Sequence, residues 1–313
     1  MKSGVSSKGV ITIAQGSQRY INMAKELAIS LNISNPGLKK AIATDSKDNE
    51  LQDLYDFVIP TDNDFGIGII QKLLMFDYSP FEESLFIDAD CLVLKNIDFL
   101  FDQFRENDVG VIGKKVMSGS LFGFPVESMC QKLNMDFIPT FNGGLYYFKK
   151  SKTASDVFGK AKEYLYQYDS LGINRHRGNI NEEPLMALAM GFYKQAPLDD
   201  KGMGMYTPVG QSGVFKIDVL KGYCEFYKSG LKVTPAIMHF GGGYPEAFHY
   251  RREVLKMHLV YKCHFNKTIS STIVNGLYNP AYILYVIGYR LLKRIVKRTP
   301  FKLFPLMPMF RFE

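Results

Sequence analysis

Short apolar runs alternate with longer segments of helical spacing along the first half of the chain. The apolar runs that read as strands lie at residues 10–14, 41–45 and 57–60. Between the first two, residues 21–31 carry Met23, Leu27 and Leu31 at spacings of four, which predicts a helix. Strands that alternate with helices indicate an α/β protein with a mainly parallel sheet. A further helix is predicted over residues 69–76, and it carries Lys72.

An apolar strand that ends in two carboxylates is the most unusual feature of this pattern. Ser84 to Ile87 runs into Asp88-Ala89-Asp90, and an apolar strand resumes from Cys91 to Leu94. Open α/β sheets bind ligands at the carboxyl ends of their strands. Because residues two apart on an extended strand face the same way, Asp88 and Asp90 should converge on one point. Two converging carboxylates repel unless a cation lies between them. We therefore expect them to bind a divalent metal ion that also binds a diphosphate.

The Asp-x-Asp pair by itself leaves several interpretations open. It also occurs in solvated turns between strands. An apolar strand followed by Asp-x-Asp further resembles the nucleophile strand of haloacid-dehalogenase-like phosphatases, in which Asp88 would attack phosphorus with Mg²⁺ bound nearby. A nucleotidyltransferase would share the α/β core, but it needs a glycine- and lysine-rich signature after the first strand, which residues 15–20 do not supply.

Composition and charge fit one large globular domain with a basic tail. The 313 residues are 46% hydrophobic and 22% charged. Of the net charge of +7, residues 290–313 contribute seven Lys or Arg against one Glu, so the remaining chain is near neutral and no nucleic-acid groove is indicated. Four cysteines without paired spacing predict neither a zinc site nor disulfides. The apolar run 10–14 is too short for a signal peptide, so a cytoplasmic location is expected.

The composition changes after residue 262. Residues 277–289 are apolar and aromatic but too short to cross a bilayer. From Leu291 to Arg298, apolar residues fall on one helical face and basic residues on the other, and an aromatic stretch follows. This pattern is typical of an interfacial helix that binds an anionic membrane surface without a transmembrane span. The alternative is a helix packed on the main domain with a solvated basic side.

Residues 72–97 resemble the central block of the GT-A glycosyltransferases, especially glycosyltransferase family 8. In that family a helix with a basic residue precedes Ser-Pro-aromatic and then apolar-Asp-Ala-Asp, as Lys72, Ser79-Pro80-Phe81 and Asp88-Ala89-Asp90 do here. The resemblance implies a Rossmann-like, mixed and mainly parallel sheet flanked by helices. It also implies that the Asp-x-Asp pair holds Mn²⁺ with the sugar-nucleotide diphosphate, and that Lys72 and Ala89 contact the donor. The phosphatase interpretation predicts none of this upstream context.

Two further segments match the family in order. Phe141-Asn142-Gly143-Gly144 is similar to a strand whose polar start faces the donor sugar, where glycines permit close backbone approach and Asn can bond sugar hydroxyls. Asn181-Glu182-Glu183-Pro184 resembles an acidic helix start near the anomeric carbon, which implies that Glu182 or Glu183 is catalytic. Turn formation and ordinary helix N-terminal chemistry are the respective alternatives, and the sequence does not choose between the two glutamates.

His239-Phe240-Gly241 resembles the family's His-Phe/Tyr-x-Gly element. The resemblance implies that His239 completes a metal site with Asp88 and Asp90, and that Gly241 lies at the donor. Two carboxylates, one imidazole and diphosphate oxygens suit Mn²⁺, with Mg²⁺ as a harder substitute. A lone histidine after an apolar run is otherwise a hydrogen-bonded core residue.

The loops depart from the family pattern. The usual Lys-Pro-Trp is replaced by residues 243–245, Gly-Tyr-Pro, and the lysine's role passes to Arg251 or Arg252 unless both lie on a solvated helix face. After the first strand, residues 15–17 replace the acidic residues of many relatives. Ala14 and Gln15 are still expected at the donor, and Tyr20 is expected to stack on the base or to pack at the helix start.

The resemblance covers residues 8–260 and sets the functional hypothesis. It implies a hexosyltransferase that uses a nucleoside-diphosphate sugar, UDP-linked, with retention and with a saccharide or lipid-linked acceptor, as in polysaccharide biosynthesis at the cytoplasmic face of a membrane. We expect residues 1–262 to form the catalytic domain and residues 263–313 to form the membrane-binding tail. The remaining alternative is a membrane protein that binds a sugar nucleotide without turnover.

Overall fold

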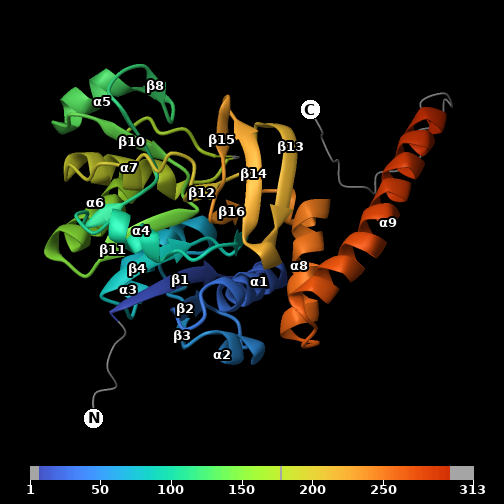
Figure 1. Cartoon of the computed structure of the whole chain (residues 1–313). Helices are drawn as coiled ribbons and strands as arrows, with labels where there is room; N and C mark the ends of the chain where they lie inside the picture. Colours follow the sequence, from blue (N-terminus) through green and yellow to red (C-terminus); the bar gives the residue numbers. More distant parts are fainter. Residues whose placement is uncertain (1–6, 177, 297–313) are drawn as a thin grey trace, which may run out of the picture.

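A six-stranded mixed sheet forms the centre of the protein, which is described by a computed structural model over residues 7–176 and 178–296. Its strands run in the order β3-β2-β1-β4-β11-β6 (Figure 1). They are β1 (Lys8–Ala14), β2 (Lys39–Thr44), β3 (Phe57–Pro60), β4 (Glu83–Ile87), β6 (Val109–Gly110) and β11 (Leu145–Lys149). The first four in the order are parallel, and β11 is antiparallel to both of its neighbours. The predicted mixed, mainly parallel sheet is therefore confirmed.

Helices cover both faces of this sheet because side chains along its strands alternate. The longer helices are α1 (Gln18–Ser34), α6 (Lys152–Tyr166), α7 (Glu182–Phe192) and α8 (Phe248–Tyr261); shorter ones are α2 (Glu50–Leu54), α4 (Asp98–Gln103) and α5 (Val126–Leu133). On β4, Phe86 packs into the same apolar cluster as α6 and α7, whereas Leu85 and Ile87 pack with α1 and α4. Every core position of β4 is fully buried, so the strand that carries the acidic pair is fixed on both sides.

Two small sheets extend the fold at the carboxyl edge. One has the order β12-β16-β5 and contains β12 (Met205–Tyr206), β16 (Ile237–His239) and β5 (Cys91–Val93). Its register sets His239 opposite Cys91, directly after the acidic pair. The other is an antiparallel sheet of β13 (Gln211–Asp218), β14 (Tyr223–Lys228) and β15 (Leu231–Val233), inserted between β12 and β16 (Figure 1). Two further hairpin-like pairs join β7 (Gly113–Val116) to β10 (Ile138–Phe141) and β8 (Ser120–Leu121) to β9 (Phe124–Pro125).

The helix predicted over residues 69–76 is present, and most of it is a 3-10 helix. The chain forms a 3-10 helix, η1 (Gly68–Leu74), and continues into the short helix α3 (Met75–Tyr78). Gly66 and Gly68 both have positive φ, which places a sharp turn directly before the segment. The side chain of Gln71 then donates to the carbonyls of Asp62 and Gly66, so these backbone groups are bound by a side chain instead of an α-helical amide.

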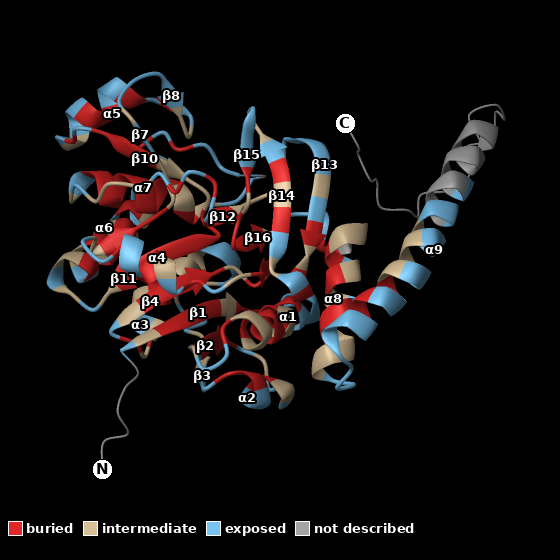
Figure 2. Ribbon diagram, viewed as in Figure 1, coloured by how far each residue is buried: buried red, intermediate tan, exposed pale blue. Residues whose placement is uncertain are grey.

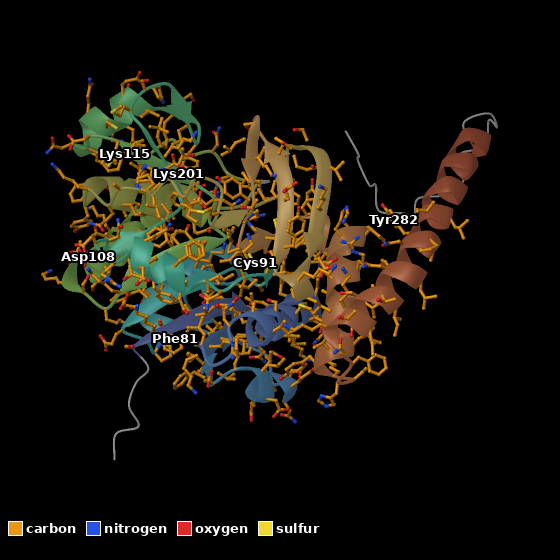
Figure 3. The ribbon with its side chains drawn as sticks, in the orientation of Figure 1. Phe81, Cys91, Asp108, Lys115, Lys201 and Tyr282 are labelled. Atoms are coloured by element: carbon orange, nitrogen blue, oxygen red, sulfur yellow. The ribbon has the colours of Figure 1, made fainter. Side chains whose placement is uncertain are left out.

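The C-terminal segment is one helix where the sequence indicated two separate stretches. A 3-10 turn, η3 (Tyr244–Glu246), leads into α8, and α9 (Lys267–Val296) then runs without a break through Pro280. The ring of Phe248 on α8 stacks with Tyr278 and Tyr282 of α9, and Figure 3 shows Tyr282 on the side of α9 that faces α8. Beyond this contact α9 leaves the body of the molecule, and its described surface is mostly exposed (Figure 2).

The basic and aromatic tail beyond Val296, including Lys297 and Arg298, lies outside the described residues. Within the described residues, no helix combines the length and the apolar character needed to cross a membrane.

Candidate active site

Asp88 and Lys72 form the buried floor of the site. Asp88 follows the last residue of β4, and its amide donates to Gly144 O at the start of β11. Lys72 Nζ, from η1, donates to Asp88 Oδ2 at 2.8 Å and to Gly143 O at 3.0 Å. Burial would lower the pKa of Lys72, but the carboxylates of Asp88 and Glu182 outweigh it and raise that pKa. The lysine therefore stays charged and joins three segments that are distant in the sequence.

His239 lies between the two aspartates, and its tautomer follows from its partners. Its Nε2 is 3.1 Å from Asp90 Oδ1 and 3.6 Å from Asp88 Oδ2. Its Nδ1 is 2.8 Å from Asn142 Oδ1, an atom that also accepts from the amide of Gly144 at 3.0 Å. Because a backbone amide can only donate, the Asn142 atom is the oxygen and His239 Nδ1 carries the hydrogen. In the neutral ring, Nε2 then presents its lone pair to both carboxylates.

This arrangement fits a cation. Asp90 Oδ1 is buried, and within the described residues no well-aligned hydrogen bond reaches it. A lone pair on nitrogen facing a carboxylate oxygen at 3.1 Å is repulsive unless a proton or metal ion lies between them. Burial would lower the pKa of His239, but the neighbouring carboxylates of Asp90 and Asp88 outweigh it and raise that pKa, in keeping with a position that attracts positive charge. Two carboxylates and one imidazole nitrogen suit Mn²⁺.

Cys91 also comes close to this group, because ligand atoms of Asp90, Cys91 and His239 lie within 4.8 Å of one another. Its side chain is fully buried in the apolar cluster of β4, β5 and β16. Burial and the neighbouring carboxylates raise the pKa of the thiol well above its ordinary value. A protonated thiol is a poor ligand, so we favour Asp88 over Cys91 as the third member of the metal set.

Glu182 and Glu183 begin α7 beside the glycine pair. Glu183 Oε1 accepts from the amide of Gly143 at 2.6 Å, and Glu182 Oε1 lies 3.1 Å from Lys72 Nζ. Glu182 is almost wholly buried, and burial raises its pKa to about 7 against the opposing charge of Lys72. A Cβ at Gly143 would lie 2.7 Å from Glu182 Oε1, and one at Gly144 would lie 2.7 Å from His239 Nδ1. The two glycines are thus required by close packing of the site itself.

The three donor residues predicted around the loop after β1 differ in how accessible their side chains are. Ala14 is buried at the end of β1. The side chain of Gln15 is bound within the protein, since Nε2 donates to Asn63 Oδ1 and Oε1 accepts from the amide of Gly68. Gln15 therefore organises the loop before η1, while Tyr20 is about half exposed at the start of α1. Of these three, Tyr20 has the side chain most accessible to a base.

The glycine loop and α8 hold the remaining predicted donor residues. Ala89 is buried between the aspartates, and Gly241 lies next to the His239 ring, since an added Cβ would be 3.3 Å from Nε2. Arg251 is exposed, whereas Arg252 pairs with Glu253 and donates to Ile217 O. Arg252 is bound within the protein, and Arg251 is the more exposed of the two candidates for the role of the missing lysine. The amide of Phe240 also donates to Asp90 O, which ties the loop to the acidic pair.

Comparison with known proteins identifies the fold. No protein-family model and no curated protein matches the chain. Among solved structures, the bifunctional glycosyltransferase WbbM matches with a TM-score of 0.52 and 15% identity over 80% of this chain and 50% of that one. A structure of LgtC, a galactosyltransferase, matches with a TM-score of 0.50 and 16% identity over 75% of this chain and 87% of that one. The chain has a GT-A fold. This fold gives no support to the phosphatase interpretation, and membership of family 8 stays a prediction.

Proposed function

We propose that this protein is a metal-dependent glycosyltransferase that moves a sugar from a nucleoside-diphosphate sugar, UDP-linked, to a saccharide or lipid-linked acceptor with retention. The observation that carries the proposal is the position of His239 Nε2 between Asp88 and Asp90, with Nδ1 held by Asn142, at the carboxyl edge of a GT-A sheet. The two similar structures, WbbM and LgtC, are both glycosyltransferases.

The metal would be held by Asp88, Asp90 and His239. Bound there, Mn²⁺ supplies positive charge that stabilises the departing diphosphate. Asn142 keeps the hydrogen of His239 on Nδ1, so that Nε2 is available as a ligand. Lys72 keeps a fixed positive charge under the donor and holds Asp88 and Gly143 O in place.

The two glutamates take different roles in this proposal. Glu182 is buried against Lys72, so its role is to position that lysine. Glu183 is only partly buried and holds the amide of Gly143 with one oxygen. Glu183 is therefore the carboxylate that can touch a sugar, where it would stabilise positive charge at the anomeric carbon or orient the acceptor.

A thermal-shift screen tests the donor site. Purified protein is combined with nucleoside diphosphates and their sugars, with and without Mn²⁺, beside an Asp88→Ala/Asp90→Ala protein. Ligands that bind only the folded state raise the melting temperature. We expect a Mn²⁺-dependent rise with UDP compounds that the double variant lacks. Stabilisation by Mg²⁺ with beryllium fluoride, and by no nucleotide, would favour the phosphatase interpretation instead.

Turnover is a separate question from donor binding. Release of UDP from a UDP-sugar in the absence of acceptor is measured for the wild type and for Glu183→Gln. Slow release that falls further in the variant supports an enzyme. Nucleotide binding without release in either protein would support the non-catalytic alternative.

We further propose that residues 263–313 hold the protein at the cytoplasmic face of an anionic membrane, which would bring it to a lipid-linked acceptor. In support, α9 leaves the body of the molecule (Figure 1), and Ile269, Leu277 and Leu284 on it are 54%, 71% and 70% exposed. Exposed apolar positions on a helix that leads into a basic and aromatic tail are typical of an interfacial anchor.

A further inference from the structure

A cavity of about 270 Å³ is lined by Asn142 and lies outside the acidic pair itself, since neither Asp88 nor Asp90 lines it. Its walls come from β7, β10, β12 and the loop before β12, and Lys228 of β14 closes it from the inserted sheet. Figure 1 shows that sheet next to β12 and β16, and in Figure 3 the labelled Cys91 marks the site at its foot. The volume is close to the lower end of small-molecule sites, about 300 Å³.

Asn142 connects this cavity to the metal site. The residue lines the cavity, and its Oδ1 lies 2.8 Å from His239 Nδ1. A molecule in the cavity is therefore one side chain away from the group proposed to hold the donor diphosphate. This is the position that a second substrate of a transferase needs, next to the donor without overlapping it.

Lys228 gives the cavity its distinctive chemistry. Its Nζ donates to the carbonyl of Thr207 at 3.1 Å and lies 5.9 Å from the centre of the Tyr206 ring. No carboxylate in the described part of the chain forms an ion pair with it, although it is half-buried and burial lowers its pKa. A half-buried ammonium without a counter-ion is costly, and an anionic ligand would offset that cost.

The cavity contains three other charged side chains, of which one is buried and two are exposed. Asp200 is buried, and its carboxylate accepts from the amides of Gly202 and Gly204 and from Tyr206 OH. Three hydrogen bonds from the protein thus occupy most of its acceptor sites. Asp199 is exposed at the rim, and so is Lys114. The cavity therefore offers Asp199 and the carbonyl of Thr207 to hydroxyl groups, and Lys228 with Lys114 to an anion.

We infer that this cavity binds the acceptor, and that the acceptor is an acidic saccharide whose carboxylate or phosphate lies against Lys228. The inference rests on the proposed function, which it deepens by naming the acceptor class. The sugar hydroxyls would bond Asp199 and Thr207, while the anion pairs with Lys228 from the inserted sheet. Specificity for the anionic group of the acceptor would then reside in Lys228 at the end of β14, outside the segments that carry the proposed metal ligands.

The test compares binding of acidic and neutral sugars to the full-length protein. Isothermal titration uses glucuronate and glucose 6-phosphate as the two anionic probes, glucose as the neutral probe and inorganic phosphate as the ion alone. The proteins are the wild type, Lys228→Gln, Lys228→Arg and Lys221→Gln, a change at an exposed lysine outside the cavity. Melting temperatures confirm that each variant is folded.

We expect the wild type to bind glucuronate or glucose 6-phosphate at least about tenfold tighter than glucose. This is the gain in affinity expected from one hydrogen bond to a charged group. Lys228→Gln should abolish that preference, Lys228→Arg should keep most of it, and Lys221→Gln should keep all of it. A preference that survives in Lys228→Gln overturns the inference. So does equal binding of inorganic phosphate and glucose 6-phosphate, because the cavity would then recognise an ion and not a sugar.

Failure of this inference is distinguishable from failure of the proposed function. The thermal shift with UDP and Mn²⁺ is measured on the same protein preparations. A nucleotide shift without any Lys228-dependent preference overturns only the acidic acceptor. A Lys228-dependent preference without any nucleotide shift overturns the transferase, and with it the acceptor role of the cavity.

Discussion

Asn142 fixes the orientation of the His239 ring. Its amide oxygen lies 2.8 Å from His239 Nδ1 and also accepts from the amide of Gly144 at 3.0 Å. A residue that fixes the orientation of a metal ligand affects metal affinity as well as substrate binding. In the proposed function, Asn142 is thus a positioning residue for the metal site.

Replacing Asn142 by Ala should weaken Mn²⁺ binding. The variant removes the acceptor that keeps the hydrogen of His239 on Nδ1, and loss of such a partner costs about 10- to 100-fold in metal affinity. Free Mn²⁺ is measured by electron paramagnetic resonance during titration of the protein. Asn22→Ala, on the exposed side of α1, is the control. Equal affinity in the wild type and Asn142→Ala would show that Asn142 does not position His239.

A second prediction for a single residue concerns Gly143. In Gly143→Ala, the new Cβ would lie 2.7 Å from Glu182 Oε1 and 2.8 Å from Glu183 Cγ, so both glutamates must shift. Overpacking of this kind costs about 1–3 kcal/mol in the free energy of unfolding. Urea denaturation measures the change.

Gly159→Ala is the matched control for this substitution. Gly159 lies inside α6 with no atom within 4 Å of its added Cβ, so the change should leave stability equal or raise it by up to about 1 kcal/mol. If both variants unfold at the same urea concentration as the wild type, close packing at Gly143 does not contribute to the free energy of unfolding and the prediction is wrong.

Single residues show how far sequence reasoning reaches. Asp88, Asp90 and His239 can be singled out because polar residues at the ends of apolar strands are conspicuous. The pair Glu182 and Glu183 is found only through the family resemblance, and the choice of Glu183 depends on its lower burial in the folded protein. The role of Gln15 in holding the loop before η1 cannot be predicted from local pattern, because its partners Asn63 and Gly68 are about fifty residues away in the sequence. The burial of Lys72 between Asp88 and Glu182 likewise depends on tertiary packing that local pattern does not contain.

At the scale of elements, α8 carries a partly buried histidine that makes stability depend on pH. Burial, with the charge of Arg252 in addition, lowers the pKa of His249 to about 4. Its ring packs edge-on against Phe215 at 4.8 Å between centroids. In the unfolded chain the pKa returns to about 6.5, so the unfolded state takes up a proton first as the pH falls.

The free energy of unfolding should therefore decrease from pH 6.5 to pH 4, by at most about 3 kcal/mol from this residue. His249→Phe keeps an aromatic ring but cannot take up a proton, so its stability should fall less over the same range. The difference between the two proteins, from urea denaturation at several pH values, isolates His249 from the carboxyl groups. Parallel curves for the wild type and the variant would contradict the assignment, and His176→Gln at an exposed position should follow the wild type.

Elements divide clearly into those that local pattern predicts and those that it does not. The parallel strands are predicted because each is an apolar run bounded by polar residues, and α1 because its apolar residues recur at helical spacing. The antiparallel insertion of β11 between β4 and β6 depends on pairing over long distances in sequence. The sheet of β13, β14 and β15 has mostly exposed residues, so its sequence lacks the apolar runs that mark a buried strand.

For the whole molecule, the proposed membrane association predicts a dependence on lipid charge. The protein should co-sediment with vesicles that contain phosphatidylglycerol and much less with neutral phosphatidylcholine vesicles. Changing Arg290, Lys293 and Arg294 to Gln should weaken binding about 100-fold, at about 1 kcal/mol for each basic residue near the surface. Salt at about 1 M should also release the wild type, because the Debye length is then about 3 Å.

The control for this experiment carries the same loss of charge elsewhere. Lys47, Lys132 and Lys201 are exposed on the main body, and their replacement by Gln should leave vesicle binding unchanged. Equal loss in both triple variants would mean that net charge, and not the tail, determines the interaction.

The inserted sheet leaves the small β12-β16-β5 sheet at β12 and returns to it at the adjacent strand β16. Its two points of attachment are therefore neighbours. Of the proposed metal ligands, Asp88 and Asp90 lie between β4 and β5, outside the inserted sheet, and His239 lies on β16, where the chain returns. Such an insertion can change in length and sequence while the ligand geometry stays constant. In a lineage of these proteins, the group that contacts the anion of the acceptor could be replaced by exchange of one module, while the proposed donor site is inherited unchanged.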